Sequence, residues 1–141
     1  MGDRMTILES IRSKATKLHK SVVLPEGDEE RNLQAAAIMT SIGMAKVILV
    51  GDGSSIRSHA DTYGVSLAGI DVVDVKTSPR LADYALLIYV KRKAKGVTAE
   101  QAAQMALDPI HHATCMLAKG DVDALVTGAV HSTGDMLRPA L

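Results

Sequence analysis

The sequence is poor in aromatic residues and carries no net charge. It has no tryptophan or phenylalanine and only three tyrosines, so the aromatic platforms on which single-stranded bases stack are almost absent. Lysine and arginine number 16, as do aspartate and glutamate. Such a chain has no general positive field for nucleic acid or an anionic membrane surface. We therefore expect no nucleic-acid partner and no membrane partner, and any anion must be bound locally.

Cysteine is almost absent as well. The single Cys115 cannot form a disulfide within the chain. It lies in an apolar helical pattern, which is more typical of a packed side chain than of a reactive thiol. The first residues do not resemble a signal peptide, and no apolar run approaches the roughly 20 residues that a membrane span needs. These absences predict a cytoplasmic protein.

What is present is the composition of a globular domain with one core. Hydrophobic residues make up 47% of the 141 residues and charged residues 23%, proportions typical of soluble globular proteins. Four short apolar runs, rich in β-branched residues, predict buried strands. They lie at about 21–24, 45–50, 70–75 and 124–127.

Helical patterns precede and separate these runs. Helices are expected at about 4–19, at 28–43 with Asp28 as N-cap, at 56–63, from Ser78-Pro79 to about 95, from Thr98, and from Asp108-Pro109 to Gly120. A parallel crossover needs a connection long enough for a helix. The alternation therefore predicts an α/β fold, a three-layer α/β/α sandwich with a mainly parallel sheet.

The strongest candidate site is the loop after the last expected strand, because ligands of open parallel sheets bind at the carboxyl ends of strands. The loop contains Gly128, His131, Ser132, Thr133 and Arg138. A glycine that permits close backbone approach, two hydroxyls, an imidazole and a guanidinium suit a phosphoryl group. An alternative stays open, in which Ser132 only caps a final helix, Thr133 is solvated and Arg138 pairs with a carboxylate.

Other polar positions are weaker candidates. Glu26, just after the first strand, either orients an arginine or a substrate donor at the sheet edge or belongs to the start of the next helix. Residues 51–53 read Gly-Asp-Gly but do not continue as a dinucleotide or Walker motif, so we interpret them as a tight turn. The neighbours His111 and His112 point about 100° apart on a helix, so no metal site is expected there.

Four motifs follow one another along the chain. They are VLPEGDEER at 23–31, RKAKGVT at 92–98, Asp-Pro at 108–109 and GAVHSTGDMLRPAL at 128–141. The last resembles the GAxHSTADTxRPAL signature of phosphotransacetylases, and all four have that family's order and approximate spacing. The chain departs from the family pattern at residues 111–113, where an aromatic pair and glycine are common, and at Gly134, which is usually alanine. We interpret these departures as packing changes.

The resemblance implies a fold similar to one lobe of isocitrate or isopropylmalate dehydrogenase. Residues 1–141 would form the N-terminal lobe of a phosphate acyltransferase, with the C-terminal domain absent. The family interconverts acetyl-CoA and phosphate with CoA and acetyl phosphate, so CoA is a substrate and no further cofactor is implied. Family members generally form homodimers through the domain that would be missing.

The resemblance also assigns roles by position. Arg92 and Arg138 would be two of the catalytic arginines that hold phosphate, and Ser132 and Thr133 would lie in the phosphate-binding loop. The base and further groups would come from the C-terminal portion, so this stretch alone is expected to be inactive. The alternatives are a phosphate butyryltransferase, a non-catalytic ligand-binding module such as those attached to some malic enzymes, and a folding unit that binds anions only weakly.

Overall fold

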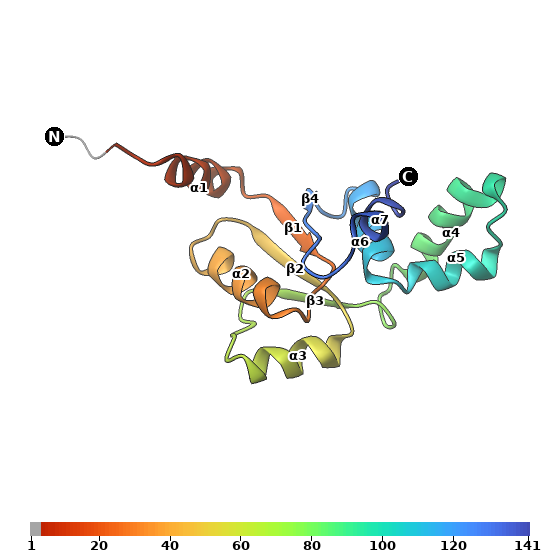
Figure 1. Ribbon diagram of the computed structural model, residues 1–141, viewed down its shortest axis with the longest axis horizontal. Helices are drawn as coiled ribbons and strands as arrows, with labels where there is room; N and C mark the ends of the chain where they lie inside the picture. The colour runs from red at the N-terminus through yellow and green to blue at the C-terminus, as the bar shows by residue number, and fades with distance from the viewer. Residues whose placement is uncertain (1–3) are drawn as a thin grey trace.

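The structure is a computed structural model that describes residues 4–141 (Figure 1). Its elements are α1 (Ile7–Leu18), β1 (Ser21–Leu24), α2 (Glu30–Ser41), β2 (Lys46–Gly51), α3 (Gly53–Thr62), β3 (Asp71–Asp74), α4 (Leu81–Arg92), the 3-10 helix η1 (Lys93–Lys95), α5 (Ala99–Ala106), α6 (Pro109–Ala118), β4 (Ala124–Leu125) and α7 (Thr133–Leu137). Every strand and helix expected from the sequence is present, with shifted ends. The α/β fold class is confirmed.

The four strands form one sheet in the order β3-β2-β1-β4, and all three strand pairs are parallel. Val23 in β1 lies opposite Ile48 in β2 on one side and Leu125 in β4 on the other. The strands β1 and β2 are apolar along most of their length because both faces of the sheet are covered by helices. The predicted parallel sheet is therefore confirmed.

Two hydrophobic clusters lie on the two faces of this sheet. Val23, Ile48 and Val50 pack with residues of α4, α5 and α6. On the other face, residues such as Val47 and Leu49 pack with α2 and α3. Because neighbouring residues of a strand point to opposite faces, β2 contributes to both clusters. Figure 1 shows α2 and α3 on one side of the sheet and α4 to α6 on the other.

Several predicted helix starts are wrong. The structure caps α2 with Glu29, whose side chain accepts the N–H of Asn32, and not with Asp28. The Gly-Asp-Gly turn is the start of α3, because the Asp52 side chain caps that helix and the helix begins at Gly53.

The predicted start of α4 at Ser78-Pro79 is also wrong. This helix begins at Leu81, and its N-cap has no side-chain hydrogen bond. By contrast, the capping box of Thr98 with Gln101 and the Asp108 cap with Pro109 in the first turn are confirmed.

Helix α1 differs from the others because its apolar stripe is not part of the core. It has the expected helical form and begins with a capping box at Thr6, but none of its residues is buried. Ile7, Leu8, Ile11 and Leu18 are all more than half exposed. Figure 1 shows α1 extending away from the sheet. Within residues 4–141, no helix has both the length and the apolar character needed to cross a membrane.

Candidate functional site

The candidate site lies where β1 and β4 end. These strands are parallel neighbours, so their carboxyl ends lie at the same edge of the sheet. The loop after β1 carries Glu26, and the loop after β4 carries Gly128 to Ser132. The two loops that the sequence offered as separate candidates are therefore in contact.

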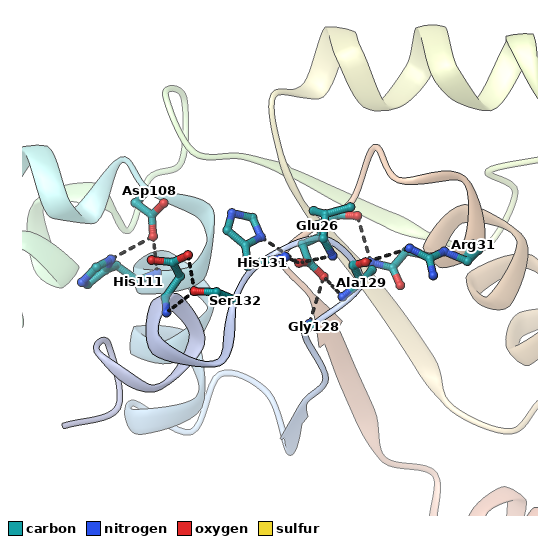
Figure 2. A network of polar contacts seen from close by, with 11 residues as sticks. Glu26, Arg31, Asp108, His111, Gly128, Ala129, His131 and Ser132 are labelled. Atoms are coloured by element: carbon teal, nitrogen blue, oxygen red, sulfur yellow. Dashed lines mark hydrogen bonds and ion pairs between the residues drawn. The ribbon is translucent and has the colours of Figure 1, made fainter.

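The contact is made by the Glu26 carboxylate, which the β4–α7 loop surrounds (Figure 2). Its Oε2 accepts the backbone N–H groups of Gly128 and Ala129, at 3.1 and 2.7 Å. Its Oε1 accepts those of Val130 and His131, both at 3.0 Å. The His131 ring nitrogen Nδ1 lies 2.7 Å from the same oxygen. Four consecutive backbone donors and one imidazole therefore converge on one side chain.

Glu26 is only 3% exposed, yet it is ionised. Burial opposes the charge, but hydrogen bonds from the His131 ring and from the backbone of Val130, Ala129 and His131 outweigh it. Together they lower the pKa of Glu26 to about 2. Because an ionised carboxylate only accepts hydrogen bonds, this network assigns a proton to Nδ1 of His131. The second ring nitrogen, Nε2, is left for other partners.

Two side chains from the first turn of α2 hold the two loops through their carbonyl oxygens. Arg31 donates from Nη2 to the carbonyl oxygen of Ala129 at 2.7 Å and from Nε to Glu29 at 2.6 Å. The Asn32 side chain donates to the carbonyl oxygen of Glu26 at 3.0 Å. The sequence reasoning did not assign Arg31 a role. Its only signal was its place in the motif at residues 23–31.

Gly128 has a conformational role in this arrangement. Its φ is +116°, in the region that L side chains rarely adopt, and an added Cβ would lie 2.9 Å from the Met136 sulfur. Its N–H is directed to Glu26. The close backbone approach predicted for this glycine thus occurs, and the group approached is a carboxylate of the same chain.

Ser132 caps α7, as the alternative interpretation held. Its Oγ accepts the N–H of Asp135 at 3.3 Å and donates to the Asp135 carboxylate at 2.7 Å. Thr133 is the first residue of α7, and both hydroxyl residues are exposed. The pKa of Asp135 is lowered, first by the Ser132 hydroxyl and to a smaller extent by the charges of Arg138 and His131. Arg138 and His131 therefore lie within electrostatic range of the same carboxylate.

The two predicted arginines are brought together at the other end of α7. Arg92, the last residue of α4, donates from Nη2 to the backbone carbonyl of Arg138, which follows α7. Arg138 is exposed. None of the ion pairs between described residues includes Arg138, so its alternative pairing with a carboxylate is not formed. With five residues in α7, the Ser132 and Arg138 ends are roughly 8 Å apart along the helix.

Arg92 also lines a hollow between α4, α6 and the last three residues of the chain. Cys115 lies at this hollow and is 5% exposed. Burial raises the pKa of its thiol to about 11, so the thiolate is disfavoured. The prediction that Cys115 packs in the core is confirmed.

The adjacent histidines point apart, as expected. His111 donates its N–H to the Asp108 carboxylate and holds its Nδ1 2.8 Å from the same oxygen. His112 is fully buried, and its Nδ1 lies 3.0 Å from the carbonyl oxygen of Ala106. Its ring packs edge-on against Tyr84, with 4.7 Å between the ring centroids. Across residues 4–141, no three His, Cys, Asp or Glu side chains are grouped so as to hold a metal ion.

Known proteins are similar to this chain in sequence and in fold. Residues 6–141 match the family model described as phosphate acetyl/butaryl transferase. The phosphate acetyltransferase of Clostridium acetobutylicum is 41% identical over 137 residues, which are 97% of this chain and 41% of that protein. The phosphate acetyltransferase of Acetivibrio thermocellus is 40% identical over 137 residues, again 97% of this chain and 41% of that protein. The chain thus spans about 41% of the length of these curated relatives.

Solved structures agree in fold. The EutD phosphotransacetylase from Staphylococcus aureus has a TM-score of 0.85 and 33% identity, covering 95% of this chain and 40% of that one. A phosphotransacetylase from Streptococcus pyogenes has a TM-score of 0.88 and 28% identity, covering 97% and 42%.

Proposed function

The chain belongs to the phosphate acetyl/butaryl transferase family, and from that premise we propose that it supplies the phosphate-binding half of an active site for acetyl transfer. The reaction is the reversible conversion of acetyl-CoA and phosphate to CoA and acetyl phosphate. The observation that carries this proposal is the β4–α7 segment, where His131, Ser132 and Arg138 lie on one loop and short helix with Arg92 bonded to its end.

In this proposal, Arg92 and Arg138 are the catalytic arginines. A guanidinium presents its donors in a planar fork that matches phosphate oxygens and stays charged at any working pH. Placed against the acyl phosphate, it stabilises the negative charge that grows or shifts as the acyl bond forms or breaks.

Ser132, Thr133 and His131 bind phosphate through their side chains. The backbone N–H groups of residues 128–131 already point to Glu26, so they are not counted among the phosphate donors. Gly128 provides the turn that these contacts need. The hydroxyl of Ser132 has to exchange its bond with Asp135 for one with phosphate.

The remainder of the site is assigned to a second lobe. We place residues 1–141 as the N-terminal lobe, with the catalytic base and most of the CoA site in a C-terminal lobe through which the whole protein forms a homodimer. The greater length of the relatives supports this division. CoA and acetyl-CoA are substrates, no separate cofactor is required, and the cytoplasm is the proposed location.

A chimera tests the function. Residues 6–141 would replace the aligned segment of the C. acetobutylicum enzyme, and CoA release from acetyl-CoA would be followed with phosphate as acceptor. The unmodified chimera is expected to turn over. Residues 6–141 tested alone are expected to be inactive. A folded chimera without turnover would contradict the proposal.

The arginine assignment is tested in the same chimera. Arg138→Ala is expected to lower kcat/KM by about 10²- to 10³-fold, the usual effect of removing one donor to a developing charge. Arg57→Ala, in the exposed part of α3, is the matched control and should turn over normally. An Arg138→Ala chimera with the unmodified rate at saturating substrates would remove Arg138 from the site.

A further inference from the structure

Glu26 is the polar group of this region that the proposed reaction does not use. Among the residues that the structure describes, the buried polar side chains are Glu26 and His112. His112 lies in the core next to Tyr84, whereas Glu26 lies directly beneath the candidate phosphate loop. An ionised carboxylate is costly to bury unless it is well hydrogen-bonded, so its place here calls for a specific role.

The conformation of the loop depends on this carboxylate. The N–H groups of four consecutive residues, 128–131, are directed to its two oxygens at 2.7 to 3.1 Å. Such converging donors form neither a helix nor a strand ladder, so Glu26 replaces the partners that regular structure would supply. Without it, four neighbouring donors would lack an acceptor, and the loop would have to rearrange.

The same carboxylate orients the His131 ring. Nδ1 of His131 lies 2.7 Å from Oε1 of Glu26, and the His131 side chain is 41% exposed. Because the proton on Nδ1 is donated to Glu26, Nε2 is the ring nitrogen available to a ligand. Figure 2 shows the ring held at the Glu26 end of the loop that continues into Ser132. The orientation of the His131 ring is thus set by one buried group, Glu26.

The geometry points to Glu26 as a positioning residue of the phosphate site: it fixes the loop from Gly128 to Ser132 and orients His131 so that Nε2 contacts bound phosphate. This role rests on the proposed function for its ligand. The orientation of His131 does not depend on the proposed function, because it concerns only contacts within the chain.

The orientation is tested on the 141-residue chain without any ligand. Long-range ¹H–¹⁵N spectra of the imidazole nitrogens should show neutral His131 with its proton on Nδ1. Glu26→Gln, which keeps the shape but removes the charge, should shift His131 toward the Nε2–H form. Asp52→Asn is the matched control, because this capping carboxylate bonds Ser54, Ser55 and Lys76 and not His131; it should leave the signal unchanged. An Nε2–H tautomer in the unmodified chain would overturn the inference.

The contact with phosphate is tested in the active chimera by substitutions at His131. Asn places an amide donor near the position of Nδ1, so His131→Asn keeps the bond to Glu26 and removes Nε2. Its KM for phosphate should rise roughly tenfold, the effect of one lost hydrogen bond, with KM for acetyl-CoA unchanged. Glu26→Gln should raise the phosphate KM and lower kcat, and Glu26→Asp should restore part of the loss. An unchanged phosphate KM in His131→Asn would overturn the role of Nε2.

The two proposals can fail separately. An inactive but folded unmodified chimera would contradict the proposed function, while the His131 tautomer would still support or overturn the positioning by Glu26. If Glu26→Gln does not fold, the tautomer of the unmodified chain and the His131→Asn kinetics decide the inference.

Discussion

At Glu26, burial and hydrogen bonding act in opposite directions on one carboxylate, and hydrogen bonding is the stronger. Its pKa is lowered from 4.5 to about 2, so the folded state favours the ionised form. The resulting stabilisation is fully present above pH 4.5 and is lost as the pH falls toward 2. The loop is therefore held by an interaction that acid removes.

We predict that Glu26→Gln reduces the acid sensitivity of folding. Between pH 7 and pH 3, the native chain should lose about 2 kcal/mol more free energy of unfolding than the variant, given a pKa that moves from 4.5 to about 2. Urea unfolding at the two pH values measures the difference. Asp108 and Asp135 also have lowered pKa values. Both are present in the native chain and in the variant, so their contributions to the difference in unfolding free energy cancel. Equal losses would show that Glu26 is not ionised in this way.

His112 gives a second pH effect with a different midpoint. Burial lowers its pKa below the usual 6.5, with partial opposition from its bond to the Ala106 carbonyl. The neutral ring is favoured in the fold, so its contribution is present above pH 6.5 and decreases as the pH falls and the unfolded chain takes up a proton. His112→Phe, which retains an aromatic ring against Tyr84, should make unfolding less pH-dependent between pH 7 and 5. Thermal melts at these pH values test this, and parallel curves would contradict it.

At the scale of elements, α1 and α6 are helices of similar length with different support. Helix α6 buries five residues, including Ile110 and Met116, whereas α1 buries none. Isolated helices of about 12 residues are marginal in water. The apolar stripe of α1 is therefore an incomplete contact surface within this chain.

We predict that amide hydrogens of α1 exchange at least tenfold faster than those of α6. Local opening of α1 breaks no core contact, whereas opening of α6 disrupts the cluster that includes Val23 and Ile88. Hydrogen exchange followed by NMR or mass spectrometry on the chain gives both rates. Comparable protection in the two helices would mean that α1 is packed in solution.

At the scale of the whole molecule, the two hydrophobic clusters share one sheet and should unfold together. Leu49 and Ile88 lie in different clusters, and they are 0% and 6% exposed. Either residue replaced by alanine should cost about 2 to 5 kcal/mol in a single transition. Leu86→Ala, at 59% exposure, should change stability by less than about 0.5 kcal/mol. Two separate urea transitions in any variant would show that the faces fold independently.

The fold could be predicted from local pattern because its strands are short apolar runs and most of its helices have ordinary stop signals. Helix starts were less certain, since Glu29 and Asp28 are both acceptable caps and only the structure distinguishes them. Strand β4 is two residues long instead of the expected four. After Val126 donates to Val23, the chain leaves the sheet, and the N–H groups of residues 128–131 bind Glu26.

The candidate loop could also be found from sequence, but its construction could not. The contacts of Glu26 join residues 102 to 105 positions apart, and no local period reports such a pairing. The motif at residues 23–31 marked the right segment without indicating what it binds. The roles of Arg92, Arg138, Ser132, Thr133 and His131 toward phosphate stay predictions that the chimera experiments address.

The long separation between Glu26 and its donors has a consequence for biosynthesis. At about 5 to 20 residues per second, a ribosome completes residues 128–131 roughly 5 to 20 seconds after Glu26. During that interval the nascent chain can form β1, β2 and the helix α2 between them, but the Glu26 side chain lacks the imidazole and the amide donors of residues 128–131. Closure of the loop around it must therefore wait for the synthesis of residues 128–131, and a stall before residue 128 would leave a sheet edge with an unpartnered carboxylate.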